Sequence, residues 1–236
     1  MVYQRHYKTR KKSFFAGMTL NNLLIFINVI VFVLIITIIA FEGKVTDINN
    51  SSLRYVALNP ALFFQGFIWT LLTSMFMHGS FGHLFVNMIS MFFVGDFVER
   101  LIGRKRYLRF YFLSGLVAGL FFVILAYLGQ FIPYGARIFG GMDSFAVGAS
   151  GALFGLGGLL AILIPRLKVL VFFIIPMPMW LAMAVLMFGL WIFSITADLP
   201  VGNTAHFGGL VVGLIYGLYL RTKYARKVRI LNRMFG

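Results

Sequence analysis

The sequence contains six apolar stretches, each close to the length of an α-helix that crosses a lipid bilayer. A hydrocarbon core of about 30 Å needs roughly 20 apolar residues in helical form. Hydrophobic residues make up 61% of the 236 positions and charged residues only 11%, too few polar side chains to cover a water-soluble domain. We therefore predict an all-α polytopic membrane protein, with spans at about 20–41, 84–102, 107–128, 149–164, 179–197 and 203–220.

These spans form one predicted six-helix domain over residues 20–220, between basic tails at 1–19 and 221–236. The first apolar stretch follows a basic tail and lacks a small-residue cleavage site, so we interpret it as a span and not as a signal peptide. The compact architecture and the lack of a recognisable targeting sequence lead us to expect a multi-pass protein of a prokaryotic cytoplasmic membrane.

The positive charge is distributed unevenly across the predicted membrane. With the N-terminus placed in the cytoplasm, all but three of the 21 Lys and Arg residues fall on the cytoplasmic side; the three are Lys44, Arg54 and Arg137. This distribution follows the positive-inside rule, so we expect both termini in the cytoplasm. Contact with anionic lipid headgroups explains the net charge of +15 more simply than nucleic acid does, and we predict no nucleic-acid partner.

The segments between the spans differ in character. The first outer loop, about 42–82, is long and aromatic, which is typical of a segment lying in the membrane interface, as a plain lid or anchor or as a part of substrate access. The outer loop at about 129–147 is rich in glycine. In the apolar segment Val169–Pro178, Pro176 and Pro178 disfavour a continuous helix, so the fifth span starts after them.

Four polar residues are expected at a similar depth in the membrane. Ser150 and His206 each lie about 22 Å from the cytoplasmic end of their spans, while His83 and Asn87 lie about 25 and 20 Å from theirs, at roughly 1.5 Å of rise per residue. Polar side chains inside spans are costly and are candidates for function. Because all four lie several ångströms below the outer surface, they are close enough in depth to meet.

Small residues suggest how the fourth and sixth spans approach each other. Gly151 and Gly155 form one row with small-xxx-small spacing, and Ala205, Gly209, Gly213 and Gly217 form another. Such rows allow close helix packing in lipid. Because Gly151 adjoins Ser150 and Ala205 adjoins His206, the packing seam and the two polar side chains occur at the same helix ends.

The residue types at this depth favour acyl-transfer chemistry. A serine hydroxyl needs a base to become a nucleophile, and histidine serves at neutral pH. His83 and Asn87, four residues apart, share a helical face as potential oxyanion donors, together with the backbone N–H of Ser150. No carboxylate is expected at that depth, so we predict a Ser150–His206 dyad. The absence of cysteine excludes disulfides and a cysteine nucleophile.

The chain resembles the rhomboid intramembrane serine proteases of the basic six-span type. The matching segments are Gly148-Ala149-Ser150-Gly151, Ala205-His206-Phe207-Gly208-Gly209 and His83-Leu84-Phe85-Val86-Asn87, with His78, Glu99, Gly103 and Ser114-Gly115 extending the likeness over residues 65–220. The resemblance implies that Ser150 is acylated, that His206 is its general base, and that His83, Asn87 and the Ser150 N–H bind the oxyanion. It also implies a polar cavity open to water on the outer face.

Two positions depart from the family pattern. Trp69-Thr70 stands where the family often has Trp-Arg, which removes an arginine that would anchor the first outer loop. Phe154 stands where a tyrosine often stacks on the catalytic imidazole, so stacking is retained without a phenol hydroxyl. We count Gly148, Gly151, Phe154 and Gly209 as supporting residues of the site.

The sequence therefore predicts a serine endopeptidase that hydrolyses a peptide bond near the outer end of a substrate's transmembrane helix, which must unwind locally. Its expected partners are transmembrane protein substrates and the lipid bilayer. The alternatives are a catalytically silent rhomboid-like scaffold and a small-solute channel or transporter. No cofactor is expected. No metal site is expected either, because no Asp, Glu or Cys joins His78, His83 and His206 in a ligand set.

Overall fold

In the computed structural model the chain is mostly helical, and the structure describes residues 18–42, 52–172, 174–197 and 202–235. Most of the predicted N-terminal tail, with Arg5, Lys8, Arg10, Lys11 and Lys12, lies outside the described residues, as do Lys44 and Asp198. Helices occupy all six predicted ranges. They are α1 (Leu20–Glu42), α4 to α5 (Phe81–Ile102), α6 (Arg104–Gly129), α8 (Ser150–Leu163), α9 to α10 (Met179–Ala197) and α11 (Asn203–Lys223).

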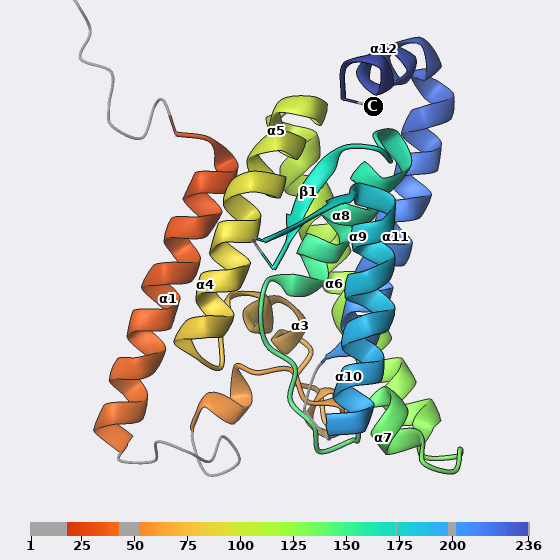
Figure 1. The fold of residues 1–236 in the computed structure, drawn as a ribbon. Coiled ribbons are helices and arrows are strands. Elements are labelled where there is room, and N and C mark those ends of the chain that lie inside the picture. Colours follow the sequence, from red (N-terminus) through yellow and green to blue (C-terminus); the bar gives the residue numbers. More distant parts are fainter. Residues whose placement is uncertain (1–17, 43–51, 173, 198–201, 236) are drawn as a thin grey trace, which may run out of the picture.

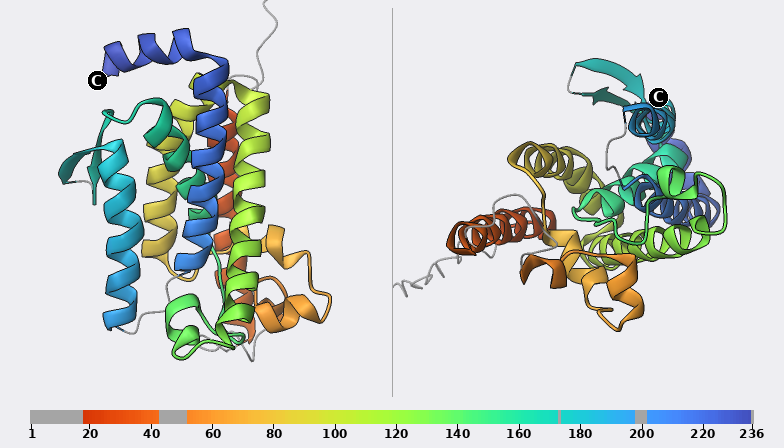
Figure 2. Two further views of the ribbon diagram at one scale, coloured as in Figure 1. Left: turned by 90° about the vertical axis from the view of Figure 1, so that its right-hand side faces the viewer. Right: turned by 90° about the horizontal axis from the view of Figure 1, so that it is seen from below.

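Four of these helical segments are long and apolar enough to cross a membrane: Leu20–Glu42, Phe81–Ile102, Arg104–Gly129 and Met179–Ala197. α8 is apolar but shorter, with 14 residues. Most of its side chains are buried, and it packs most extensively on α11 and α6 (Figure 1). α4, α6, α9 and α11 lie around this helix (Figure 2).

Two of the long segments contain a π-helical turn. α4 (Phe81–Ser90) continues through η5 (Met91–Gly95) into α5 (Asp96–Ile102). α9 (Met179–Ala184) continues through η6 (Val185–Gly189) into α10 (Leu190–Ala197). In η5 the Met91 carbonyl accepts from the Asp96 N–H, at the five-residue spacing of a π-helix, and it also accepts a hydrogen bond of 2.9 Å from the Asn21 amide of α1.

Glycines bring α8 and α11 into backbone contact, as the small-residue rows predict. A Cβ added at Gly209 would lie 1.9 Å from the Gly151 carbonyl oxygen, and one at Gly213 would lie 2.2 Å from that of Gly155. Ser114 of α6 also packs against Gly155, where an added Cβ would lie 2.5 Å from the serine oxygen. Larger side chains would therefore force apart the two helices that carry Ser150 and His206.

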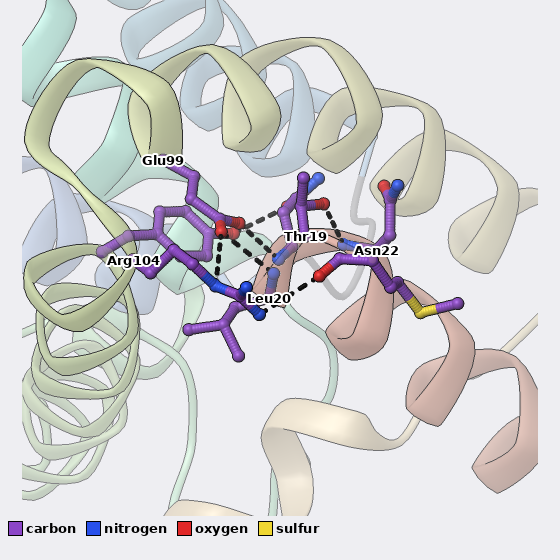
Figure 3. Close-up of polar contacts among 8 residues, drawn as sticks. Thr19, Leu20, Asn22, Glu99 and Arg104 are labelled. Atoms are coloured by element: carbon purple, nitrogen blue, oxygen red, sulfur yellow. Dashed lines mark hydrogen bonds and ion pairs between the residues drawn. The ribbon is translucent and has the colours of Figure 1, made fainter. Parts of the chain in front are cut away.

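The first turn of α1 is held by a buried carboxylate of α5 (Figure 3). Glu99 accepts hydrogen bonds from the backbone N–H groups of Leu20 and Asn21, at 3.0 and 2.7 Å. These N–H groups lack intrahelical acceptors because they begin the helix. Arg104 lies 3.6 Å from the same carboxylate and also donates to the Met18 carbonyl. The N-terminal end of α1 is thus fixed to the turn between α5 and α6.

The loops contain elements that the sequence analysis did not predict. The predicted first outer loop holds the short helices η3 (Ser52–Tyr55), α2 (Pro60–Phe64), α3 (Thr70–Thr73) and η4 (Ser74–Phe76). The predicted second outer loop holds α7 (Gly135–Phe139). The proline-containing segment is non-helical, as expected, but forms an antiparallel hairpin of β1 (Lys168–Val171) and β2 (Ile175–Pro178). The segment predicted as a basic C-terminal tail contains the end of α11 and a further helix, α12 (Ala225–Phe235).

Candidate functional site

Ser150 and His206 meet between α8 and α11. Ser150 is the first residue of α8, and His206 lies in the first turn of α11. The imidazole Nε2 of His206 lies 2.8 Å from the Ser150 hydroxyl oxygen, within hydrogen-bonding distance. The serine is partly buried and the histidine is buried. This geometry allows the imidazole to accept the hydroxyl proton.

Phe154, one turn after Ser150, packs flat on the His206 ring. The two ring centroids are 4.4 Å apart and the ring planes differ by 15°. On the other edge of the imidazole, Nδ1 is buried, and within the described part of the chain it has no hydrogen-bond partner. The imidazole is therefore oriented by aromatic packing, and no described carboxylate forms the third member of a triad.

The loop before α8 places Gly148 against His83 and Asn87 of α4. Gly148 has φ +116°, a conformation that side chains disfavour, and a Cβ there would lie 2.8 Å from the His83 ring and 3.7 Å from the Asn87 amide nitrogen. The Gly148 N–H donates to the Ser74 carbonyl, at 2.8 Å. Only glycine fits this position without displacing His83.

His83 and Asn87 lie on one face of α4, as their spacing predicts. The Asn87 amide donates to the His83 carbonyl at 2.9 Å, which leaves its second amide hydrogen available. Ser80 caps the helix by accepting from the His83 N–H at 3.1 Å. The Ser150 N–H begins α8 and belongs to the groups that lack an intrahelical acceptor. The potential donors of the predicted oxyanion site are therefore two side chains next to Gly148 and the backbone N–H two residues after it.

His78 lies next to this group, in the loop before α4. Its ring is buried and stands edge-on to the His83 ring, with centroids 5.1 Å apart. Burial, together with the neighbouring His83, lowers the pKa of His78 to about 4. Because that pKa lies well below neutral pH, the His78 ring is uncharged there and packs as an aromatic side chain.

Sequence reasoning missed the contacts that hold the pre-α8 loop. Besides the bond to Ser74, Ala146 pairs with Leu58 of the first outer loop in a short antiparallel bridge. These are backbone contacts between distant segments, and the side chains carry no signal for them. No group of three or more His, Cys, Asp or Glu side chains that could hold a metal ion occurs in the described ranges.

Comparison with known proteins identifies relatives of the chain. A family model described as the rhomboid domain matches residues 65–223. RHOMBOID-like protein 12, mitochondrial, of Arabidopsis thaliana is 33% identical over 65% of this chain and 46% of its own length. Rhomboid protease GluP of Bacillus subtilis is 28% identical over 77% of this chain and 31% of its own length. Inactive RHOMBOID-like protein 8 of Arabidopsis is 41% identical over 31% of this chain and 21% of its own length.

The chain spans half or less of the length of each of these relatives. They include a protein named as mitochondrial and a bacterial protein, so they do not support the expected assignment to a prokaryotic cytoplasmic membrane. Together with the four membrane-length helices, they support a membrane protein.

Proposed function

The chain belongs to the rhomboid family, and from this premise we propose that it is an intramembrane serine endopeptidase that cleaves transmembrane segments of other membrane proteins. The observation that carries the proposal is the 2.8 Å contact between the Ser150 hydroxyl and the His206 imidazole. Two polar side chains from different helices are expensive to place in a membrane, and here they form the pair that acyl transfer requires.

In the proposed reaction, the Ser150 oxygen attacks the carbonyl carbon of the scissile peptide bond while His206 Nε2 accepts the hydroxyl proton. The resulting tetrahedral intermediate collapses as the imidazolium gives that proton to the leaving amine, and the C–N bond breaks. Water then attacks the acyl-serine ester, with His206 accepting a proton from water and returning it to the Ser150 oxygen. The products are a free carboxylate and the regenerated serine.

The oxyanion of the tetrahedral intermediate would receive hydrogen bonds from His83, Asn87 and the Ser150 N–H. The second amide hydrogen of Asn87 is free for this role because the first is bound to the His83 carbonyl. Both side chains project from α4, whose N-terminus is fixed by the Ser80 cap. Donors fixed before the reaction stabilise developing charge without reorganisation.

The proposed topology has six spans in the domain 20–220, with both termini in the cytoplasm and the site toward the outer face. The short length of α8 supports this arrangement, because 14 residues measure about 21 Å along the helix, less than the hydrocarbon thickness. A helix that reaches the cytoplasmic side therefore starts below the outer surface. Ser150 at its start would be reached by water from the outer face.

The second candidate is a catalytically silent scaffold that binds membrane clients. It is favoured by one relative that is named as inactive, with 41% identity over 73 residues. A scaffold has no need for a serine–histidine contact in hydrogen-bonding geometry, which this chain has. We therefore rank the endopeptidase first.

The experiment that tests the proposal is labelling of the full chain in detergent with a fluorophosphonate, which reacts with activated serines. The samples are wild type, Ser150→Ala, His206→Ala and, as a matched control, Ser90→Ala on α4. Thermal unfolding of each sample verifies its fold. We expect labelling of wild type and Ser90→Ala, and none of Ser150→Ala or His206→Ala.

Peptide-bond cleavage is then measured in proteoliposomes with two single-span reporters, one of which carries a glycine-rich break at the outer end of its helix. The proposal predicts Ser150-dependent cleavage of the interrupted reporter at a higher rate. A folded wild type that does not label, or a Ser150→Ala variant that labels like wild type, would establish the scaffold instead.

A further inference from the structure

α12 crosses the basic end of the bundle instead of continuing along α11 (Figures 1 and 2). Asn232 donates to the Leu163 carbonyl at the end of α8, at 2.7 Å. Near the C-terminus, the Phe235 ring packs edge-on against Phe97 of α5, with centroids 5.5 Å apart. On α12 itself, the Val228 side chain is buried. These contacts hold α12 against α8 and α5.

A cavity of about 350 Å³ lies beneath one side of α12. Most of its wall is apolar: Leu101 and Ile102 of α5, Leu220 of α11, and Val228 and Leu231 of α12 contribute to it. Its volume falls within the roughly 300–1,000 Å³ typical of small-molecule sites. The cavity lies at the end of the bundle that carries Arg100, Arg104 and Lys105, which is the level of lipid headgroups if α5 and α6 cross the membrane.

Cations gather where this cavity meets the surface. Arg106 and Lys227 line it together with Tyr224. The Arg106 guanidinium lies 5.8 Å from the centre of the Tyr224 ring, while the ammonium groups of Lys223 and Lys227 each lie 5.9 Å from it. Three positive charges thus lie close to one tyrosine ring, and one of them, Lys223, also donates to the Tyr219 hydroxyl at 2.7 Å.

Nearby carboxylates do not neutralise this cluster. Asp96 and Glu99 are the acidic residues of α5, and both have other partners: Asp96 pairs with Arg100, and Glu99 pairs with Arg104 and the start of α1. Across the described ranges, Arg106, Lys223 and Lys227 form no ion pair. The three cations are therefore available to bind an anion that is not part of the chain.

An apolar cavity with a cationic rim at the membrane boundary matches a molecule with an anionic head and an apolar body. We propose that this site binds one anionic phospholipid, with its phosphate between Arg106 and Lys227 and part of an acyl chain against Leu101, Ile102 and Leu231. A second copy of this chain fits the surface poorly, because the outer side of α12 carries exposed Arg226, Arg229 and Arg233 and two such helices would repel each other.

The test is native mass spectrometry of the full chain in detergent, titrated with phosphatidylglycerol or with phosphatidylcholine of the same acyl composition. The charge variant is Arg106→Gln/Lys227→Gln. Its matched control is Arg226→Gln/Arg229→Gln, which removes the same charge from the same region at positions that do not line the cavity. A third variant, Leu231→Phe, reduces the cavity without changing charge. Thermal unfolding checks each fold.

We expect the first phosphatidylglycerol to bind wild type about tenfold more tightly than phosphatidylcholine, and the charge variant to lose about tenfold in that affinity, because each interfacial cation contributes severalfold. The Leu231→Phe variant should lose a similar factor, and the control variant less than about twofold. If the charge variant does not fold, the Leu231→Phe result decides.

Four outcomes would overturn the proposal. Equal losses in the two charge-deleted variants would indicate diffuse attraction, and equal affinity for both lipids would exclude recognition of the anionic head. Full displacement by glycerol phosphate would indicate a soluble anion as the occupant. Appearance of a dimer as lipid is removed would assign the surface to a second copy. None of these results depends on Ser150, so this proposal and the proposed protease activity can fail separately.

Discussion

The ring of Phe154 lies nearly parallel to the imidazole of His206, at a centroid distance of 4.4 Å. Because His206 Nδ1 has no hydrogen-bond partner among the described residues, this stacking replaces the orienting hydrogen bond that a triad carboxylate supplies. Side-chain packing thus fixes the direction in which Nε2 points, which is toward the Ser150 hydroxyl.

Loss of this aromatic face should slow the reaction more than it destabilises the fold. Phe154→Leu keeps an apolar side chain of similar volume but removes the flat surface, so we expect the fluorophosphonate labelling rate to fall about tenfold or more, since small misplacements of catalytic groups are costly. Phe154→Tyr retains the ring and serves as the control, with a labelling rate within about threefold of wild type. Equal rates for the two variants would contradict an orienting role for the stacking.

Removing a proposed oxyanion donor should lower the rate of peptide-bond cleavage without unfolding the protein or displacing Ser150 and His206. Asn87→Ala and His83→Ala are each expected to lower the rate of reporter cleavage about 10²- to 10³-fold, the usual effect of removing one such donor. The measurement is kcat on the interrupted reporter in proteoliposomes. Phe85→Ala, at an exposed position of α4 between the two, is the control. If Asn87→Ala cleaves at the wild-type rate, its amide does not contact the oxyanion.

Much of this architecture follows from local sequence signals. The six helical ranges are predicted to within a few residues, because long apolar runs and charged ends define them. The close approach of Gly151 and Gly209 is likewise anticipated by the small-residue spacing, and the structure confirms it. This close approach of α8 and α11 brings Ser150 and His206 together, although they lie 56 positions apart in the sequence.

The elements that the sequence did not predict depend on contacts between distant segments. The hairpin of β1 and β2 forms where two prolines exclude helix, but proline alone does not specify strand pairing. The charge of residues 221–236 predicts a basic tail, but Val228, Leu231 and Phe235 recur with helical spacing and form one side of α12. The π-helical turn η5 carries a hydrogen bond from Asn21 to the Met91 carbonyl, a contact between residues 70 positions apart.

Because α8 and α11 are in backbone contact, we expect a single added methyl group between them to destabilise the fold. In Gly209→Ala the new Cβ would meet the Gly151 carbonyl at 1.9 Å, and backbone atoms must separate to accommodate it. We expect destabilisation by about 1–3 kcal/mol, typical of overpacking, together with reduced labelling. Gly82→Ala is the matched control, because a Cβ there has nothing within 4 Å. Thermal unfolding in detergent compares them, and equal midpoints would show that the seam can relax.

We expect replacement of the Glu99 carboxylate to lower the stability of the fold at a site distant from Ser150 and His206. Glu99→Gln leaves one side-chain oxygen to accept from the two N–H groups of Leu20 and Asn21, and its amide nitrogen would face a donor. Because Glu99 is only 4% exposed, bulk water cannot reach an unpaired N–H at this position, and we expect the free energy of unfolding to fall by about 1–3 kcal/mol.

Asp96→Asn is the control. It removes a carboxylate of the same helix whose partner, Arg100, is largely exposed, and such pairs contribute about 0–1 kcal/mol. Thermal unfolding midpoints of the two variants provide the measurement. If Asp96→Asn lowers the midpoint as much as Glu99→Gln does, general loss of negative charge at this end, and not the fixing of α1, accounts for the effect.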